Sequence, residues 1–431
     1  MTEMEKRINR RNFLKAAGTA GLSSVLVTAK AAVSDESDAA DSNRIEGAQK
    51  PAYPQVPRRK LGRTGVEVPC LSLGTNRLDS QVVLRAAVRH GISYWDTSPN
   101  YVGQNSELNI GRFLSKSPEL RKKLFIVTKA SGARSGPNAK AFVAAVEERL
   151  RASLERMNAE YVDLYYGVHG LSDPAQLTDE LKEWVKSAKE RKLIRFFGFS
   201  THKNMAQNLA AAAKLDWIDA IMTAYNFRLM QDPDMRAAVK ACHDAGIGVV
   251  AMKVIALSVK ERSRLEAGQK IETEHDKKLL GHFLEQGLTV EQAKIKYVLA
   301  DKRISSACIG MSNVANLTLN VAAALDKNAL TQADMEALNE YARATCSGYC
   351  AGCAHVCDSV LPDAPYVSDI MRYLMYYNGY GEHDEARERF AEIPGSVRGK
   401  LLDLDYRVAE ARCPQHLPIR ELIAEALDKL T

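Results

Sequence analysis

Short apolar runs alternate with longer amphipathic stretches through the middle of the chain, from residue 69 onward. The stretches have a helical period; Lys140–Arg156, for example, carries Phe142, Val146 and Leu150 on one face. Strands that alternate with helices of this length form βαβ units and a parallel sheet, and eight such units favour a closed α/β barrel of the (β/α)8, or TIM, type. The apolar runs that predict strands are Pro69–Gly74, Ile92–Asp96, Leu124–Lys129, Val162–Val168, Arg195–Ser200, Ala220–Ala224, Gly248–Met252 and Ser306–Gly310.

The segments on either side of these units complete the predicted organisation. No Gly-x-Gly-x-x-Gly follows any of the strands, which argues against a Rossmann domain. Residues 59–68 are typical of a hairpin with its turn at Arg63–Gly65, placed to plug the bottom of the barrel. We therefore expect an N-terminal hairpin, a barrel over residues 57–330 and a mainly helical, cysteine-rich module over residues 331–431.

The first residues of the chain have the pattern of an export signal. The pair Arg10 and Arg11 is followed by Phe-Leu-Lys, by a mildly apolar stretch and by the small-x-small site Ala29-Lys30-Ala31. This pattern resembles a twin-arginine (Tat) signal peptide over residues 1–31, followed by a polar linker over residues 32–56. It predicts a periplasmic or otherwise exported protein, with the Tat translocon as its partner during export.

Composition and charge narrow the choice of partners. The chain has 431 residues, of which 46% are hydrophobic and 26% charged, as is ordinary for a globular protein. Its net charge of +6 is concentrated at the N-terminus, where residues 1–31 hold six Lys or Arg and two Glu. No basic stripe remains for nucleic acid, and no apolar run reaches the length of ~20 residues that spans a bilayer.

Four residues lie where the active site of such a barrel lies, at the C-terminal ends of its strands. Asp96 ends the second strand and Tyr101 lies in the loop after it, while Lys129 and His169 end the third and fourth strands. A lysine ammonium beside a tyrosine lowers the pKa of the phenol, and an aspartate fixes the lysine. We therefore expect Tyr101 to donate a proton to a substrate carbonyl as a hydride reaches the carbon, with His169 hydrogen-bonded to the carbonyl.

These residues carry a family resemblance. Asp96-Thr97-x-x-x-Tyr101, Val127-Thr128-Lys129 and His169 resemble the Asp/Tyr/Lys/His tetrad of the aldo-keto reductases, over roughly residues 57–330. The resemblance implies NADP or NAD bound across the top of the barrel and a small-molecule aldehyde, ketone or alcohol as substrate. The cofactor-binding residues that it implies are Gly74, Thr75, Ser200, Thr201, Met222, Tyr225, Lys253, Gly310, Ser312, Asn316 and Asn320.

The predicted cofactor site also departs from the family pattern. Met222 stands where the family usually has the Gln that holds the carboxamide, and Met252, followed by Lys253, replaces the stacking Tyr. Asn316 replaces an Arg that is expected to pair with the 2′-phosphate of NADP. Because Arg binds phosphate through a charged fork and Asn does not, the choice between NAD and NADP stays open.

Five cysteines are crowded into the C-terminal region. The tight run Cys346, Cys350, Cys353 and Cys357, with Cys413 before a proline further on, resembles a bacterial ferredoxin run with one residue inserted. It predicts a 4Fe–4S cluster, held by the first three of the run with Cys413 or by the last three with Cys413. A zinc ion or disulfides formed in an oxidising compartment are the alternatives.

These features lead to one hypothesis and two alternatives. The leading hypothesis is an exported oxidoreductase that exchanges a hydride between NAD(P)(H) and a carbonyl compound or alcohol. Its iron–sulfur cluster would pass electrons to a redox partner protein. The altered cofactor site motivates the second hypothesis, an electron-transfer or redox-sensing protein that no longer turns over. The third is a binding protein built on a retired barrel and stapled by disulfides.

Overall fold

The computed structural model describes residues 53–78, 80–133, 138–257, 259 and 273–431. The predicted signal peptide and the predicted linker as far as residue 52 lie outside these ranges. Residues 53–56, which we expected in the linker, contact the barrel: Val56 is buried in the core, and its N–H donates to the carbonyl oxygen of His90 at 3.0 Å. In the described part of the chain, no helix has the length and apolar character to cross a membrane.

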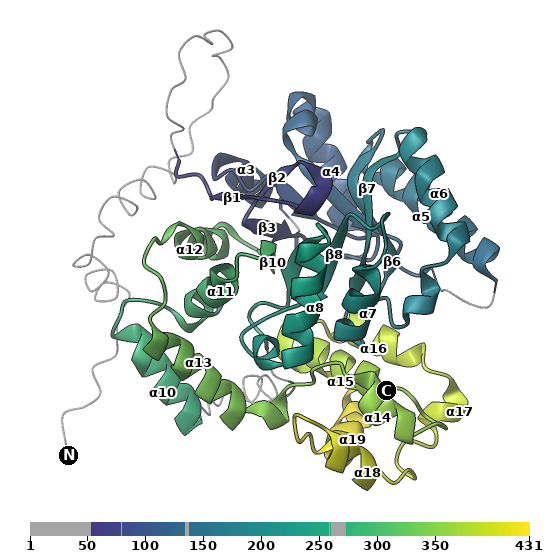
Figure 1. Cartoon of the computed structure of the whole chain (residues 1–431), viewed down its shortest axis with the longest axis vertical. Helices are drawn as coiled ribbons and strands as arrows, with labels where there is room; N and C mark the ends of the chain where they lie inside the picture. Colours follow the sequence, from purple (N-terminus) through teal and green to yellow (C-terminus); the bar gives the residue numbers. More distant parts are fainter. Residues whose placement is uncertain (1–52, 79, 134–137, 258, 260–272) are drawn as a thin grey trace.

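Eight parallel strands close into a barrel, which confirms the predicted fold class (Figure 1). Strand β10 pairs with both β9 and β3, so the sheet has no free edge. The strands lie close to the predicted runs, except that Pro69 ends the preceding hairpin rather than beginning β3. They are β3 (Leu71–Gly74), β4 (Tyr94–Asp96), β5 (Phe125–Lys129), β6 (Val162–His169), β7 (Ile194–Thr201), β8 (Ala220–Ala224), β9 (Gly248–Met252) and β10 (Ile304–Gly310).

Amphipathic helices cover the outside of the barrel and bury their apolar faces against it. In α5 (Ala139–Met157), the side chains of Phe142, Val146 and Leu150 lie in this core, as their spacing predicts. Leu338 and Tyr341 of α13 (Gln332–Ala344) are buried in the same core, so the core of the barrel includes residues beyond 330. The other covering helices are α3 (Gln81–Arg89), α4 (Asn105–Lys116), α6 (Asp179–Glu190), α7 (Met205–Ala212), α8 (Pro233–Asp244), α10 (Glu274–Leu284), α11 (Val290–Ala300) and α12 (Val314–Leu325).

The predicted hairpin plugs the bottom of the barrel. Strands β1 (Arg58–Lys60) and β2 (Glu67–Pro69) pair antiparallel, with the short helix η2 (Gly62–Thr64) between them. Leu61 and Val68 of this hairpin are fully buried among the side chains that fill the barrel. The hairpin therefore closes the lower end of the barrel.

The tight packing of the plug makes a stability prediction. Gly62 has a φ of +52°, and a Cβ there would lie 2.3 Å from the carbonyl oxygen of Gly246 and from the amide nitrogen of Gly248. We expect Gly62→Ala to lower the free energy of unfolding by about 2–5 kcal/mol, because a backbone clash adds to the cost of the positive φ. The control is Gly65→Ala, at a φ of +73° with nothing within 4 Å, which should lose only about 1–2 kcal/mol. Urea denaturation measures both, and equal losses would contradict this packing.

The C-terminal residues form a helical module with a hydrophobic core of its own, which includes Ile370, Leu374 and Phe390. Its helices gather at one end of the barrel (Figure 1). This is the end where the strands finish, because Glu382 of the module accepts a hydrogen bond from Asn76, just after β3, at 2.9 Å. The module therefore covers the barrel's open mouth. Its elements are η6 (Cys346–Gly348), α14 (Ala354–Cys357), η7 (Asp358–Val360), α15 (Val367–Met375), the π-helix η8 (Tyr376–Tyr380), α16 (His383–Ala391), α17 (Gly395–Arg398), α18 (Arg407–Arg412) and α19 (Ile419–Leu430).

Candidate active site

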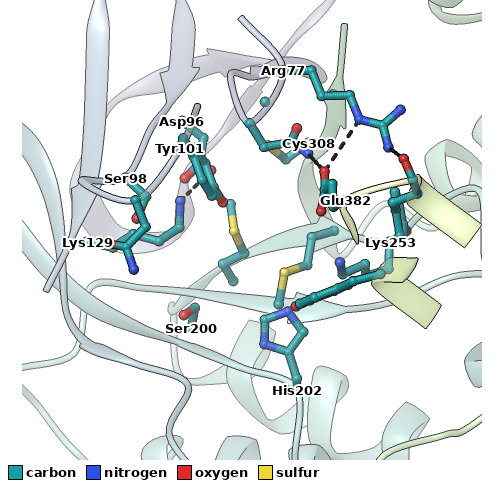
Figure 2. Close-up of a pocket in the computed structure, with 18 of the residues that line it drawn as sticks. Arg77, Asp96, Ser98, Tyr101, Lys129, Ser200, His202, Lys253, Cys308 and Glu382 are labelled. Atoms are coloured by element: carbon teal, nitrogen blue, oxygen red, sulfur yellow. Dashed lines mark hydrogen bonds and ion pairs between the residues drawn. The ribbon is translucent and has the colours of Figure 1, made fainter. Parts of the chain in front are cut away.

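A cavity of about 260 Å³ lies between the strand ends and the C-terminal module, and Figure 2 shows residues that line it. All four predicted catalytic residues line this cavity. The predicted cofactor residues in its wall are Gly74, Ser200, Met222, Lys253 and Gly310, and the module contributes Tyr376, Tyr380, Glu382, Glu385 and Arg389. Barrel and module thus build the cavity together.

The register of the sheet brings the predicted acid–base residues together. Asp96, Lys129 and His169 are the last residues of the consecutive strands β4, β5 and β6. The Nζ atom of Lys129 donates to Oδ1 of Asp96 at 2.6 Å and to the carbonyl oxygen of Thr97 at 2.8 Å. The same Nζ lies 4.8 Å from the centroid of the Tyr101 ring. The side chains of the lysine and the aspartate are buried, so each charge depends on the other for compensation.

Hydroxyl groups fix the loop that carries Tyr101. Ser106, at the start of α4, lies 2.8 Å from the hydroxyl of Thr97 and donates to the hydroxyl of Thr75 at 2.6 Å. Thr75 in turn donates to the carbonyl oxygen of Asp96 at 2.8 Å. Thr75 is therefore outside the cavity wall: its buried hydroxyl anchors the catalytic loop instead of facing the predicted cofactor.

Burial sets the protonation of the acid–base residues. It raises the pKa of Tyr101 well above 10, and the negative charge of Asp96 raises it further. The lowered pKa expected from Lys129 is therefore wrong for this structure, because desolvation of the phenolate dominates. Burial, then the positive charge of Lys129, holds the pKa of His169 well below 6.5. At neutral pH the phenol keeps its proton for donation, and the imidazole is neutral.

His169 has hydrogen-bonding capacity to offer a ligand. Its Nδ1 atom is buried and finds no hydrogen-bond partner in the described part of the chain. A neutral imidazole carries one donor and one acceptor, so it can bond to a carbonyl or hydroxyl oxygen.

Two predicted cofactor residues at the ends of β7 and β8 form hydrogen bonds to other parts of the protein, away from the cavity. The hydroxyl of Thr201 is buried and donates to the carbonyl oxygen of Leu171 at 2.7 Å. The ring of Tyr225 is buried in the core outside the barrel, and its hydroxyl donates to Oδ2 of Asp301 at 2.9 Å. Neither residue lines the cavity. Their hydroxyl groups instead hold parts of the surrounding structure in place.

Three further predicted cofactor residues lie outside the cavity, before and along α12. Asn316 is exposed in the first turn of α12, and its amide donates to the hydroxyl of Ser312 at 3.4 Å. Asn320 lies one turn further along this helix. Gly310 in the cavity wall precedes α12 by only four residues, so a long ligand could reach from the cavity to the start of this helix.

Lys253 is held by the module rather than by the barrel. It has a φ of +57°, and its Nζ lies 4.4 Å from the ring centroids of both Tyr376 and Tyr380. Two aromatic faces thus stabilise one half-buried ammonium in the cavity wall. Met222 and Met252 line the barrel side of the cavity, where the sequence departs from the family pattern.

Sequence analysis missed part of the cavity wall. Ser98 and Ser131 follow the ends of β4 and β5, and their hydroxyls lie 2.6 Å apart. Their position after catalytic strand ends was a signal that could have found them. The module's Glu385 and Arg389 gave no such signal, because a charged pair on a helix is typical of a solvated face.

The structure gathers four of the five C-terminal cysteines. Cys357 ends α14, Cys413 follows α18, and these two helices pack together. Cys357 and Cys413 are buried in the module's core, with Cys350 packed against it, and Cys353 directly precedes α14. All cysteines of the chain are free thiols. Among the described residues, no three or more His, Cys, Asp or Glu side chains form a group that could hold a metal ion.

Comparison with known proteins agrees with this geometry. A model of the aldo/keto reductase family matches residues 71–343, more than half of the chain. The chain belongs to the aldo/keto reductase family. It is an oxidoreductase of the aldo/keto reductase type, a family that uses NAD(P)H.

Relatives and solved structures of this family resemble the barrel. L-galactose dehydrogenase of Arabidopsis thaliana is 25% identical over 303 residues, covering 66% of this chain and 93% of that protein. L-glyceraldehyde 3-phosphate reductase of Escherichia coli K12 is 25% identical over 311 residues, covering 63% and 88%. The holo form of an aldo-keto reductase from Bacillus halodurans has a TM-score of 0.52 at 22% identity, covering 67% of this chain and 96% of its own, and supports the fold.

Proposed function

We propose that this aldo/keto reductase exchanges a hydride between NAD(P)(H) and a small aldehyde, ketone or alcohol in the cavity. The observation that carries the proposal is the buried Asp96–Lys129 pair beside Tyr101, at the strand ends of the barrel. A bound nicotinamide supplies or accepts the hydride. Tyr101 donates its proton to the carbonyl oxygen, His169 hydrogen-bonds that oxygen, and the Asp96–Lys129 pair positions Tyr101.

The residues around the cavity fit one end of a dinucleotide. A cavity of about 260 Å³ is smaller than a typical ligand pocket of about 300–1,000 Å³, so it has room for part of the cofactor. The exposed start of α12 lies four residues from Gly310 in the wall, and a helix N-terminus favours phosphate. Ser312 and Asn316 would hold the phosphate and ribose end there. The names of the two relatives, a sugar dehydrogenase and a triose phosphate reductase, are in keeping with a small carbonyl or alcohol substrate.

This placement of the cofactor predicts the effect of one charge change. We expect Asn316→Arg to improve the binding of NADPH relative to NADH by about tenfold or more, because Arg adds a charged fork for the 2′-phosphate. Fluorescence titration with both nucleotides measures the ratio of the two Kd values. Asn328→Arg is the charge-matched control, since it adds the same charge in the exposed segment after α12. An equal shift in both variants would contradict a phosphate site at the start of α12.

We also propose that the module holds a 4Fe–4S cluster on Cys350, Cys353, Cys357 and Cys413. The supporting observation is that Cys357 and Cys413 lie in the module's core, with Cys350 packed against it and Cys353 directly before α14. Cys346, in contrast, begins η6 just after α13. Sulfur atoms around one zinc ion lie ~3.8 Å apart, but cluster ligands bind different irons and stand further apart. Four thiolates that hold a cluster therefore need not stand as close together as the four ligands of a zinc ion.

The position of Cys350 supports an electron-transfer role for that cluster. A second, small cavity is lined by Cys350 together with His202 and Lys253, and these last two residues also line the catalytic cavity. The cluster would then lie next to the catalytic cavity and could pass electrons to a redox partner protein. We also propose that the protein is periplasmic or otherwise exported. The Tat route is understood to carry proteins that have already folded. Such a route suits a chain that has bound its cluster before export.

The proposed ligand set predicts that replacing Cys413 and replacing Cys346 have opposite effects on the iron content of the protein. Protein purified anaerobically from a Tat-competent host should contain about four irons and four sulfides per chain and absorb near ~400 nm. We expect Cys413→Ser to lose most of this iron and absorbance, and Cys346→Ser to keep both. Iron, sulfide and visible spectra measure the effect. A wild-type protein without iron would contradict the cluster, and loss in Cys346→Ser would contradict the ligand set.

A further inference from the structure

The C-terminal module is tied to the barrel on two opposite sides of its mouth. Strands β3 and β7 are four strands apart in either direction round the closed barrel, so their ends face each other across the mouth. On the β7 side, Nζ of Lys203 pairs with Asp358 at 3.0 Å and with Asp369 at 3.1 Å. On the β3 side, Asn76 and Arg77 contact the module just before α16. The module therefore spans the catalytic cavity between two sets of contacts.

Four residues form the contact on the β3 side, which we call the latch: Asn76, Arg77, Tyr380 and Glu382. The carboxylate of Glu382 accepts hydrogen bonds from Nδ2 of Asn76 at 2.9 Å and from Nε of Arg77 at 3.4 Å, as Figure 2 shows for Arg77 and Glu382. The guanidinium of Arg77 also donates to the carbonyl oxygen of Tyr380 and lies 5.7 Å from the centroid of its ring. Gly381, at a φ of +66°, turns the chain between the two module residues and so brings Glu382 to the loop after β3.

The ion pair of the latch is accessible enough to open. The side chains of Arg77 and Glu382 are 35% and 20% exposed, so water can replace each partner when the two separate. The contacts on the β7 side involve less exposed acidic groups, since Asp358 is 8% and Asp369 15% exposed. The latch is therefore the side on which the module can lift from the barrel.

The latch lies beside the route that the proposed cofactor takes. Asn76, Arg77 and Glu382 line the catalytic cavity. Gly310, at the end of β10, lines it too, and a Cβ there would lie 2.6 Å from Oδ1 of Asn76. The Asn76 side chain thus rests directly on this glycine, and α12 begins four residues further on. A dinucleotide that reaches from the cavity to the start of α12 must therefore pass the latch.

A cover in this place acts on the exchange of the cofactor. A dinucleotide bound along this route has its nicotinamide end under the module and its middle beside the latch. If exchange needs an open latch, the rate constants of binding and release both scale with the fraction of time that the latch is open. The bonds of the latch join protein groups to one another, so opening it requires the same free energy with or without nucleotide. The affinity then stays unchanged while both rates change.

We propose that the module retains the nicotinamide nucleotide, and that the nucleotide enters and leaves when the bonds of Glu382 to Asn76 and Arg77 open. Glu382 controls the exchange through the position of the module, without binding the nucleotide itself. This inference rests on the hydride transfer proposed above and concerns how its cofactor is held.

Stopped-flow fluorescence of NADH and NADPH measures both rate constants on the full chain. Binding traces give kon, and displacement of the reduced nucleotide by an excess of the oxidised one gives koff. Glu382→Ala should raise kon and koff together by about tenfold or more, because it removes hydrogen bonds to a charged group, and should leave Kd within about threefold. Glu388→Ala removes the same charge from an exposed position of α16, so this control should change neither rate constant.

A second variant and the pattern of the rates make the outcomes distinct. Glu382→Gln keeps an oxygen that can accept from Asn76, so its rates should lie between those of wild type and Glu382→Ala. Unchanged rates in Glu382→Ala, equal changes in Glu388→Ala, or a rise of koff and Kd at constant kon would overturn the inference alone, the last by making Glu382 a ligand of the nucleotide. A folded wild-type protein that binds neither nucleotide would overturn the proposed function and this inference with it.

Discussion

Replacing Tyr101 by phenylalanine should lower kcat/KM for carbonyl reduction by about 10²- to 10⁴-fold, the usual contribution of a positioned general acid. In our proposal the phenol is the proton donor, and its raised pKa keeps it protonated in the resting enzyme. The free energy of unfolding should stay nearly unchanged, because the hydroxyl forms no hydrogen bond within the described chain and its loss leaves no partner unpaired. Initial rates of NAD(P)H oxidation and urea denaturation measure the two effects.

The affinity of Tyr101→Phe for the nucleotide is the control, because weaker cofactor binding would also lower the rate. Nucleotide affinity should be unchanged in Tyr101→Phe, since this ring lies beside Lys129 on the catalytic side of the cavity. Reduction at a rate near that of wild type would contradict the assignment of Tyr101 as the acid.

Replacing Lys129 by methionine should damage both stability and activity. The change leaves the carboxylate of Asp96 buried without its cation, and breaking a buried pair in this way costs about 3–5 kcal/mol of the free energy of unfolding. Activity should fall with it, because Tyr101 loses the ammonium that lies 4.8 Å from its ring. Urea denaturation and initial rates measure both losses.

The double variant Asp96→Asn/Lys129→Met separates the two roles of this pair. It removes both charges, so it should regain most of the stability lost in Lys129→Met while its activity stays low. Activity that returns together with stability would show that the pair has only a structural role.

The barrel, and the meeting of Asp96, Lys129 and His169 at one cavity, were predictable because their signals are local in the sequence. Each strand is a short apolar run, and Asp96, Lys129 and His169 stand at the ends of three consecutive runs. Because these strands are neighbours in a parallel sheet, their ends meet in space, as the register confirms for Asp96 beside Val127 and for Lys129 beside Tyr166.

The other wall of the cavity was not predictable because long-range contacts build it. Asn76 and its partner Glu382 are 306 residues apart in the sequence, and no local pattern indicates that helix α16 covers the barrel's mouth. The same cover explains the wrong expectation for the pKa of Tyr101. A lysine beside a tyrosine in water stabilises the phenolate, but under the module the loss of solvent outweighs it.

The cysteine region shows a third limit of sequence reasoning. The spacing of Cys346, Cys350, Cys353 and Cys357 allows two sets of four ligands with Cys413. Our proposal takes the set without Cys346, because α14 and α18 pack together and Cys357 and Cys413 are buried in one core, with Cys350 against it. Spacing alone contains no information on which helices meet.

Transfer of deuterium is the most direct test of the account. Wild-type protein is given NAD(P)H carrying deuterium at C4, in both stereochemical forms, together with each of a set of small aldehydes, and the alcohol formed is analysed by mass spectrometry. The account predicts that one of the two forms places one deuterium on the former carbonyl carbon, and that Tyr101→Phe forms almost no labelled product. A folded protein that binds the nucleotide but transfers no deuterium to any of the aldehydes tested would contradict it.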